Sequence, residues 1–487
     1  MLRRNAFPAL VTALAAAALL ALPPGARAFD TGHHYDLTRE ALAEEGFGNT
    51  AIQIVQVENW LTDYYSSQPL QPAMGDELAR MHFDNLFTTG QVRNYWGRLA
   101  INTRAAVQQA ARDRDVLALL TLLGCSLHAV QDFYTHSNWV ETHAPPPVAG
   151  WSGFRTETWF DDPPGPRTPN LYTGSYPDLG PGGVELHGDY DSGMNHDSYV
   201  QPRWAPAYVF GYAASRRWVN AVHGWVEEAR PGFWRSARTY VVSGGDREDL
   251  DYDLRAVYRL SEWINVAGGN GHWKGNGSGS VEFETFALAW SAAHDSRFVK
   301  QFKERHIYRQ LTDGLTGDQA PPSDPPAIPR LTFRRKAVML RTTHVEEKDD
   351  VALLEQVIDS PGGRADFYAK VTIAGQTFVE AMQGDRSSIN PHWTTITFVP
   401  AATREVSIRY ALWDEDGGTR GDDDHCDINP AKHNRDLEFT FALDSHRCSG
   451  DVTGIHDGAA QVFRSAGRKP QDDRAVVEFF VTAFDLR

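Results

Sequence analysis

The apolar positions of the chain follow a helical period in its first two thirds and a period of two near its end. Between residues 29 and 316, apolar side chains recur every three or four positions, which predicts amphipathic helices. Beyond residue 331, apolar and polar positions alternate in short segments between turn residues, which is typical of half-buried strands. We expect a multidomain chain with an all-α helical domain over 29–316, a proline-rich linker over 317–330 and an all-β antiparallel sandwich over 331–487.

The same pattern sets bounds for the individual elements. Apart from a central helix described below, the helical segments are 36–45, 50–65, 76–86, 91–114, 205–228, 246–265 and 281–312. The strand segments are 365–373, 393–399, 405–412, 437–443 and 475–484. Proline and glycine are frequent over 145–190, which predicts a long surface loop there.

The first 28 residues have the features of a secretory signal peptide. A basic start precedes an apolar run over 9–22, and Ala26-Arg27-Ala28 forms a small-residue cleavage site. The alternative is an uncleaved membrane anchor, for which the apolar run is short. We therefore expect export, to the periplasm or the medium, and a mature chain that starts at Phe29.

The segment 123–139 is the most informative part of the chain. The residues 116–127 that lead into it are apolar on nearly every side, which predicts a buried helix. His128, Asp132 and His136 follow at intervals of four, so they share one face of that helix. Buried polar groups without partners are costly, and zinc, which binds histidine nitrogen and aspartate oxygen, is the simplest partner.

Further zinc ligands are expected ahead of this helix. Asp63 lies late in a predicted helix, and His82 follows it. Alone, either residue is more often solvated or capped, but their order relative to the central motif favours a shared site. After cleavage, the α-amine of Phe29 can lose its proton near neutral pH and chelate a metal together with its own carbonyl oxygen, five residues before His34.

This order of residues resembles the zinc-dependent bacterial phospholipases C. The pattern that carries the resemblance is Phe29-x4-His34, Asp63, His82 and Leu123-Gly-x-Ser-Leu-His128-x3-Asp132-x3-His136. It is also similar to the single-strand-specific zinc nucleases and to the fungal heterokaryon-incompatibility (HET-C) proteins. The segment from Gln131 to Trp139 is closest to the HET-C branch, and the similarity covers roughly residues 29–225.

The resemblance implies a helical domain of the phospholipase C type with two or three zinc ions. The first zinc would take the Phe29 amine and carbonyl, His34 and Asp132. The second would take Asp63, His82 and His128, with Asp132 bridging the two ions. The third would take His136 together with later residues.

The third zinc site departs from the family pattern. Asp132 and His136 are four residues apart, where the phospholipases have six. Their next element, His-x3-Glu, is missing at the expected place. His196 lies near that position, and His223-x3-Glu227 has the right spacing but comes late. His196 is therefore the candidate for the third site, and a two-metal centre is the alternative.

The implied activity is the hydrolysis of a phosphodiester, with zinc neutralising the anion and activating a water molecule. Asp63 would accept the proton of that water or hold the metal pair. We expect an exported phospholipase C that acts on membrane phospholipids. The alternatives are a zinc-dependent single-strand nuclease and a non-catalytic HET-C-like protein that binds a membrane or a partner through structural zinc. Aromatic residues of the loop 145–190 would hold the substrate or pack the loop itself.

The second part of the chain carries a calcium signal. Asp414, Asp416 and Asp422 lie in a glycine-containing acidic segment, and hard oxygen donors of this kind suit calcium. Their spacing resembles the third loop of the calcium-dependent membrane-binding sandwich of protein kinase C and synaptotagmin, with Asp366 and Asp359 as the matching carboxylates of the first loop. This resemblance implies calcium-dependent binding to a phospholipid surface. The alternative is an acidic loop that binds nothing tightly.

Charge and cysteine content add two expectations. A formal net charge of −16 argues against general binding of double-stranded nucleic acid. Cys125 lies in the apolar helix as a small core residue. In an exported protein, Cys426 and Cys448 are expected to form a disulfide. The sequence indicates no oligomeric state.

Overall fold

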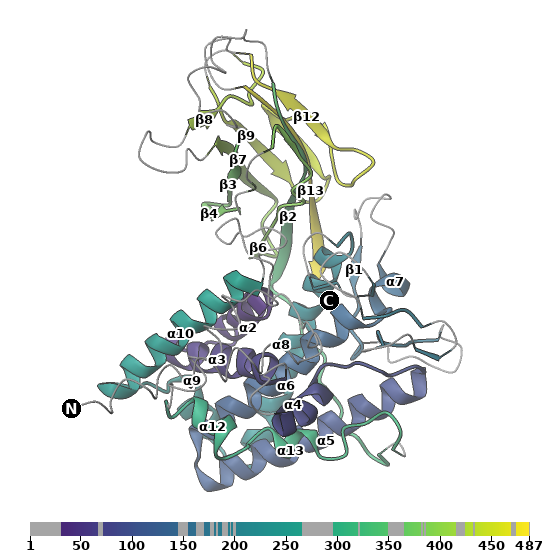
Figure 1. Ribbon diagram of the computed structural model, residues 1–487, viewed down its shortest axis with the longest axis vertical. Helices are drawn as coiled ribbons and strands as arrows, with labels where there is room; N and C mark the ends of the chain where they lie inside the picture. Colours follow the sequence, from purple (N-terminus) through teal and green to yellow (C-terminus); the bar gives the residue numbers. More distant parts are fainter. Residues whose placement is uncertain are drawn as a thin grey trace, which may run out of the picture.

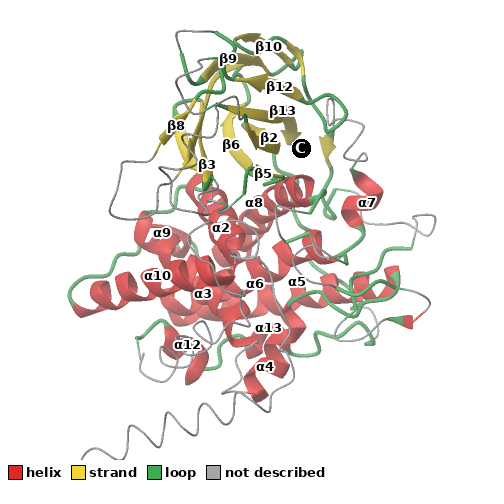
Figure 2. Cartoon of the chain, turned by 45° about the horizontal axis from the view of Figure 1, so that its top comes forward, coloured by secondary structure: helices red, strands yellow, loops and turns green. Residues whose placement is uncertain are grey.

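The computed structural model describes most of the chain between Thr31 and Leu486. The described residues are 31–66, 72–144, 154–161, 170–175, 180–181, 184–187, 193–194, 196–197, 201–264, 296–319, 322–348, 365–380, 383, 386–414, 424–431, 434–468 and 474–486. Within them, helices occupy the first part and strands the last part, as the periodicity predicted (Figure 2).

Five long helices form the centre of the helical part (Figure 1). They are α2 (Thr31–Glu44), α3 (Asn49–Ser66), α5 (Thr89–Asp113), α6 (Val116–His136) and α8 (Trp204–Ala229). Helix α6 packs against each of the other four. Asp115 caps it, because its side chain accepts a hydrogen bond from the backbone N–H of Ala118 at 2.9 Å.

Helix α6 is the axis of this bundle. By length and composition it is the one helix among the described residues that is long and apolar enough to cross a membrane. However, 94% of its most apolar stretch is buried inside the protein. The polar residues at its carboxyl end are therefore held in a dry interior, surrounded by other helices.

The remaining helices are short, except for one of twenty residues. They are α4 (Pro72–Leu78), the 3-10 helix η1 (Ala79–Met81), α7 (Trp139–His143), α9 (Phe233–Arg238), α10 (Gly245–Ile264), α12 (Val299–Lys303) and α13 (Arg309–Thr312). The predicted helix 76–86 is wrong beyond Met81, where Phe83 and Asn85 take left-handed backbone angles of φ 55° and 62°. The predicted helix 281–312 is also wrong over its described part, which forms two short helices; residues 281–295 lie outside the described residues.

The strands form two sheets that share one apolar core. Their bounds are β1 (Arg155–Thr156), β2 (Arg335–Glu347), β3 (Phe367–Ile373), β4 (Gln376–Val379), β5 (Ser388–Ile389), β6 (Thr394–Pro400), β7 (Glu405–Asp414), β8 (Asp424–Cys426), β9 (Leu437–Ala442), β10 (Arg447–Gly450), β11 (Gly454–Ile455), β12 (Phe463–Ala466) and β13 (Ala475–Leu486). One sheet has the order β1-β13-β2-β5, with β12 on β13 and β6 on β2. The other has the order β11-β10-β9-β7-β3-β4, with β8 on β7. Apart from β1, the strands pair with one another antiparallel, which confirms the predicted β region.

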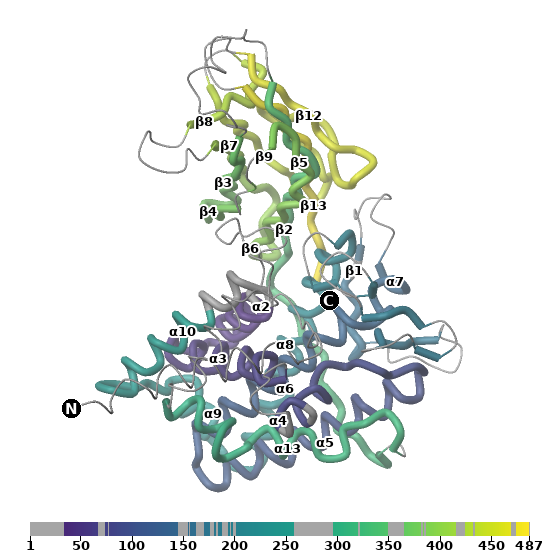
Figure 3. Tube along the Cα trace, in the orientation of Figure 1, coloured from purple at the N-terminus to yellow at the C-terminus, as the bar shows by residue number. Residues whose placement is uncertain are grey.

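The two parts are joined by packing as well as by the linker. Strand β1 comes from the helical part and pairs in parallel with the end of β13, so the chain finishes beside it (Figure 3). The ring of Tyr212 on α8 stacks on Phe398 of β6, with centroids 3.9 Å apart. Arg335 at the start of β2 forms an ion pair with Glu44 at the end of α2. The base of the sandwich therefore continues the core of the helical part.

The predicted disulfide is wrong. Cys426 and Cys448 are both described, and both are buried thiols that are not bonded to each other. Cys448 pairs with Phe441, which pairs with Val406 of β7, whereas Cys426 pairs with Leu412 of that strand. Val406 and Leu412 are ~20 Å apart along an extended strand. A disulfide needs Cα atoms within about 7 Å, so this register keeps the two thiols apart.

Candidate metal centre

Four elements bring the predicted ligands of the helical part together. His34 lies in the first turn of α2, Asp63 near the end of α3 and His82 directly after η1. The other three ligands lie on α6 at intervals of about one turn; they are His128, Asp132 and His136. None of the six side chains is more than 5% exposed. The predicted ligand Phe29 lies outside the described residues.

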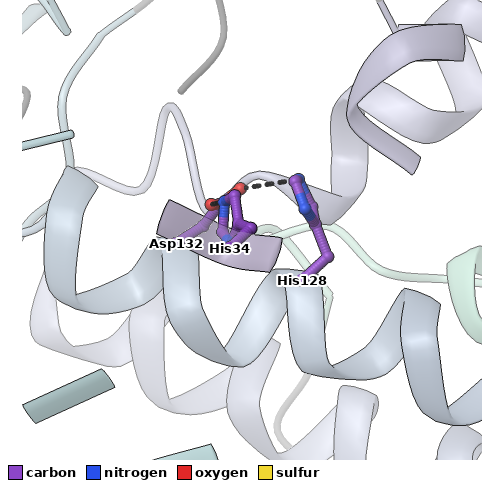
Figure 4. A group of neighbouring side chains, drawn as sticks. All are labelled: His34, His128 and Asp132. Carbon is purple, nitrogen blue, oxygen red and sulfur yellow. Dashed lines mark ion pairs between the residues drawn. The ribbon is translucent and has the colours of Figure 1, made fainter. Parts of the chain in front are cut away.

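The carboxylate of Asp132 is the common point of this arrangement. Its Oδ1 lies 2.9 Å from Nε2 of His34. Its Oδ2 lies 2.9 Å from Nδ1 of His82 and 3.2 Å from Nε2 of His128. Figure 4 shows His34 and His128 directed toward this carboxylate from one side of α6. Asp132 can therefore serve two neighbouring metal ions at once.

Three groups of ligand atoms are close enough to hold metal ions. Each group contains three side chains whose ligand atoms lie within 4.8 Å of one another. The groups are His34, His128 and Asp132; Asp63, His82 and His128; and Asp84, His136 and His187. The first two share His128 and lie around Asp132, whereas the sequence analysis assigned His128 to the second zinc alone and made Asp132 the shared ligand.

The third group differs from the prediction, because it contains His187 and Asp84 in place of His196. His136 directs its Nε2 to Oδ2 of Asp197 at 3.0 Å, and Nε2 of His187 lies 4.0 Å from the same oxygen. Asp84 lies on the other side, with Oδ1 3.4 Å from His136 Nδ1. Asp84 and Asp197 therefore face different nitrogens of His136, and among the described residues the group Asp84, His136 and His187 is the candidate for a third cation.

His196 and the His223–Glu227 pair have other roles. Nε2 of His196 lies 2.7 Å from the carboxylate of Glu141, and His196 belongs to none of the three groups among the described residues. Glu227 accepts hydrogen bonds from the N–H groups of Gly232 and Trp234 and so caps α9. The structure does not bring His196 to His136, because its neighbour Asp197 is the residue that faces His136.

The local backbone explains the position of Asp84. The residues on both sides of it, Phe83 and Asn85, have positive φ angles, which are uncommon for residues with a side chain. Phe83 is held there by the aromatic rings of Tyr95, Trp96 and Phe133. This turn directs the Asp84 carboxylate to the third group. Strained backbone of this kind collects at functional sites.

Burial and charge shift the pKa values of the ligands in opposite directions. Burial raises the pKa of Asp63 to about 7, although His82 and His34 oppose the shift. Burial alone would raise the pKa of Asp132 as well, but the surrounding imidazoles, with His128 first, hold it well below its usual range. Burial lowers the pKa of His128 to about 3, so this imidazole is neutral and presents a lone pair at neutral pH.

His136 shows the opposite behaviour. Burial disfavours its charged form, but Asp197, Asp132 and Asp84 outweigh burial and hold its pKa well above the usual range. The carboxylates around the third group therefore demand a positive charge, which is a proton on His136 in the metal-free protein. A bound cation would supply the same charge.

The donor set fits zinc. Neither oxygen of Asp132 accepts a hydrogen bond of good geometry from the described residues, although three imidazole nitrogens lie within 3.2 Å. Nε2 of His82 is likewise buried without a hydrogen-bond partner among the described residues. Lone pairs that face one another in a dry interior need a shared cation. Imidazole nitrogen and carboxylate oxygen are ligands that zinc prefers.

The aromatic residues of the predicted loop mainly pack. Trp159 stacks near Trp96 and contacts Phe133, and Phe160 stacks on Trp218. Of the two expected roles, holding a substrate or packing the loop, these contacts favour packing. Trp151 lies outside the described residues.

Of the five predicted calcium ligands, two are described and lie together. The backbone N–H of Asp366 donates to Oδ1 of Asp414 at 2.5 Å, and β8 places Asp424 opposite Asp414. Three acidic residues thus share one end of the sandwich. Asp359, Asp416 and Asp422 lie outside the described residues.

Comparisons with known proteins give limited guidance. A family model described as the VWA7 N-terminal domain matches residues 49–149, a segment that contains Asp63, His82, His128, Asp132 and His136. A search of curated proteins finds no match.

Solved structures match parts of the chain at low similarity. Human GIVD cytosolic phospholipase A2 is 14% identical over 31% of this chain and 16% of its own, with a TM-score of 0.20. A structure of two C2 domains of extended-synaptotagmin 2 is 11% identical over 34% of this chain and 47% of its own, with a TM-score of 0.19. A C2 domain-containing protein from a putative elicitor-responsive gene is 13% identical over 31% of this chain and 90% of its own, with a TM-score of 0.19. Such TM-scores leave the function open, and this chain spans about a sixth of the phospholipase A2.

Proposed function

We propose that the helical part is a zinc-dependent phosphodiesterase of the phospholipase C type. One observation carries the proposal: the buried carboxylate of Asp132 lies within 3.2 Å of nitrogens from His34, His82 and His128. A carboxylate between several imidazoles is the arrangement that holds two metal ions close together, and paired ions are suited to the displacement at phosphorus. The third group extends the centre to a third ion.

The candidate ligands would have separate roles in this centre. His34, together with the mature amine of Phe29, would hold the first zinc, and Asp63, His82 and His128 the second, with Asp132 bridging them. His136, His187 and Asp84 would hold the third. Bound zinc would supply charge for the phosphodiester anion and a water molecule of lowered pKa. Asp63 would either accept a proton from that water or hold the metal pair.

A non-catalytic role is the second candidate, and the burial of the ligands favours it. Histidines that are at most 5% exposed leave little access to the described part of the centre. Closed zinc sites that are fully ligated by protein stabilise a fold rather than catalyse a reaction. In this alternative the zinc ions would hold α2, α3 and α6 together, and the chain would bind a membrane or a partner without hydrolysis.

The sandwich supplies a separate proposal, which is calcium-dependent binding to phospholipid surfaces. Asp366 and Asp414, with Asp424 opposite, support it. Calcium takes several carboxylate oxygens, and a bound ion would connect this acidic end to anionic head groups. We expect binding to phosphatidylserine vesicles in calcium and none in excess chelator, and an Asp414→Asn variant should lose at least tenfold in affinity.

The experiment for the zinc proposal uses the exported, signal-processed protein. Metal content is measured first, and hydrolysis of phosphatidylcholine vesicles and of single-stranded DNA is then followed with and without chelator. We expect two or three zinc ions, release of phosphocholine and loss of both in Asp132→Asn. The matched control is Asp113→Asn, an exposed aspartate on α5. Hydrolysis of DNA alone would indicate a nuclease.

Two further outcomes separate the alternatives. Full zinc loading without hydrolysis of either substrate would favour the non-catalytic role. A chain without zinc at any loading would contradict the proposed function. A variant with one extra residue before Phe29 should lose one zinc, because the added peptide bond removes the free amine; retained loading would contradict the terminal-amine ligand.

A further inference from the structure

Two amide side chains lie directly behind the metal-facing histidines. Oε1 of Gln131 lies 2.5 Å from Nδ1 of His34. Oδ1 of Asn59 lies 3.2 Å from Nδ1 of His128. In both histidines the opposite nitrogen, Nε2, is the one that faces Asp132. Each amide therefore contacts the ring nitrogen that a metal ion would not use.

A closed set of hydrogen bonds couples the orientations of the two amides. The NH2 group of Asn59 donates to Thr38 Oγ1 at 3.1 Å and to Gln131 Oε1 at 3.1 Å. The NH2 group of Gln131 donates to the hydroxyl oxygens of Thr38 and Ser215, both at 3.2 Å. If one amide alone were turned over, two donors or two acceptors would face each other between Asn59 and Gln131. In the orientation of the structure, both amide oxygens face the histidines.

This network connects the four helices that surround the centre. Thr38 lies on α2, Asn59 on α3, Gln131 on α6 and Ser215 on α8. All four side chains are at most 1% exposed, so water does not compete for these hydrogen bonds. An amide oxygen can only accept, and hence it requires Nδ1 of the facing histidine to carry the proton. The Nε2 lone pair then has one possible direction, toward Asp132.

We propose that Asn59 and Gln131 are positioning residues that fix His34 and His128 as Nδ1–H tautomers for metal binding. The inference rests on the zinc centre of the proposed function. The outer partners of metal-binding histidines are often carboxylates, which add negative charge. This centre already contains Asp63, Asp132 and the two carboxylates beside His136. Neutral amides orient the rings without adding to that charge.

The experiment compares three leucine variants of the full-length, signal-processed protein. Gln131→Leu and Asn59→Leu remove one acceptor each. Gln56→Leu is the matched control, because Gln56 is also a buried amide on α3 but donates to the backbone carbonyl of Tyr35, and within the described part of the chain it shows no hydrogen bond with a histidine. Circular dichroism confirms that each variant is folded before it is compared.

The first measurement needs no metal. In the metal-free protein with ¹⁵N-labelled histidine, the ring nitrogens of His34 and His128 should show the Nδ1–H pattern in the wild type and in Gln56→Leu. Gln131→Leu should abolish the pattern for His34, and Asn59→Leu should abolish it for His128. The second measurement is zinc affinity by competition with a chelator, in which each of these two variants should lose about 10- to 100-fold.

A conservative variant tests positioning against packing. Gln131→Glu keeps an oxygen that accepts from His34, while the hydroxyls of Thr38 and Ser215 can donate to its second oxygen. It should restore the Nδ1–H pattern and bring the zinc affinity back to within about tenfold of the wild type. Leucine variants that match Gln56→Leu in both measurements would overturn the inference. A wild type that shows the tautomers but binds no zinc would instead contradict the proposed function and support the fixed tautomers.

Discussion

The ring of His187 lies edge-on to the ring of His136, with centroids 4.2 Å apart and an interplanar angle of 81°. The two residues come from distant parts of the chain, and their contact creates a ligand group that also includes Asp84. Asp197 completes the surroundings at 3.0 Å from His136. The third group of candidate ligands therefore contains His187 and not the predicted His196.

Metal content distinguishes these two histidines. His187→Ala removes an imidazole from the third group and should lower the zinc content by about one ion per chain, because the remaining ligands give too few strong bonds. His196→Ala should keep the wild-type content, since His196 pairs with Glu141. Elemental analysis after dialysis against trace zinc checks both. Loss of zinc from His196→Ala, with His187→Ala unchanged, would contradict the assignment.

Much of the centre was predictable because it depends on helical spacing. His128, Asp132 and His136 share a face through the period of the helix, and the apolar run before them shows that this face is buried. The order of His34, Asp63 and His82 added the remaining ligands of two groups. The helical part and the sandwich were predictable in the same way, because apolar residues recur with a period of about 3.6 in helices and 2 in strands.

The missed residues depend on contacts that no spacing shows. Asp84 stands after a 3-10 turn between two residues with left-handed backbone, and His187 lies within the proline- and glycine-rich segment 145–190. For Asp84, the signal in the sequence was its position two residues after the predicted ligand His82. Asp197 was adjacent to the chosen His196, but the backbone turn that decides which of the two faces His136 is not visible in the sequence. The prediction of a disulfide was wrong for a similar reason, because the register of the strands sets the distance between Cys426 and Cys448.

Zinc binding should release protons below neutral pH. In the metal-free protein burial raises the pKa of Asp63 to about 7, so at pH 6 its carboxyl group is mostly protonated and zinc must displace that proton. At pH 8 the group is already ionised, and fewer protons should be released. Titration calorimetry in buffers of different ionisation enthalpy measures this number. Asp63→Asn should reduce the release at pH 6 by about one proton; an unchanged value would contradict the shifted pKa.

Arg217 should be essential for the contact between the loop, the linker and α8. Its guanidinium group donates to Thr158 Oγ1 and to the carbonyl oxygens of Phe160 and Pro329, at 3.1 to 3.2 Å, and forms an ion pair with Asp161. Lysine keeps the charge but cannot reach these acceptors together. Arg217→Lys should lower the free energy of unfolding by about 1–3 kcal/mol, because buried acceptors lose their donors.

Urea unfolding followed by tryptophan fluorescence measures this loss. The matched control is Arg104→Lys, an exposed arginine on α5 that pairs with Glu228 and should change the free energy of unfolding little. Trypsin should also cut Arg217→Lys faster after Arg330, the one basic residue of the linker 317–330. Equal stability and equal cleavage in the two variants would show that the loop and the linker are held by other contacts.

Glu58 should make the protein less stable as the pH rises. Its side chain is fully buried on α3, and burial raises its pKa well above the usual range; a hydrogen bond with Thr121 opposes the shift and Asp253 adds to it. The unfolded chain has an ordinary glutamate with a pKa of about 4.3. From there up to the raised pKa, the folded chain holds one proton more than the unfolded chain. Stability therefore falls with increasing pH in this window.

Glu58→Gln removes this proton and should leave a flatter dependence of melting temperature on pH. The difference between variant and wild type should grow from about pH 5 upward in favour of the variant, because the wild type alone must then keep a buried proton or bear a buried charge. Calorimetric melting in excess chelator, from pH 5 to pH 8, measures it without linkage to zinc. Glu228→Gln, an exposed change on α8, should follow the wild type at every pH. A difference that shrinks as the pH rises would mean that Glu58 is ionised in the folded protein and stabilised there by a positive charge.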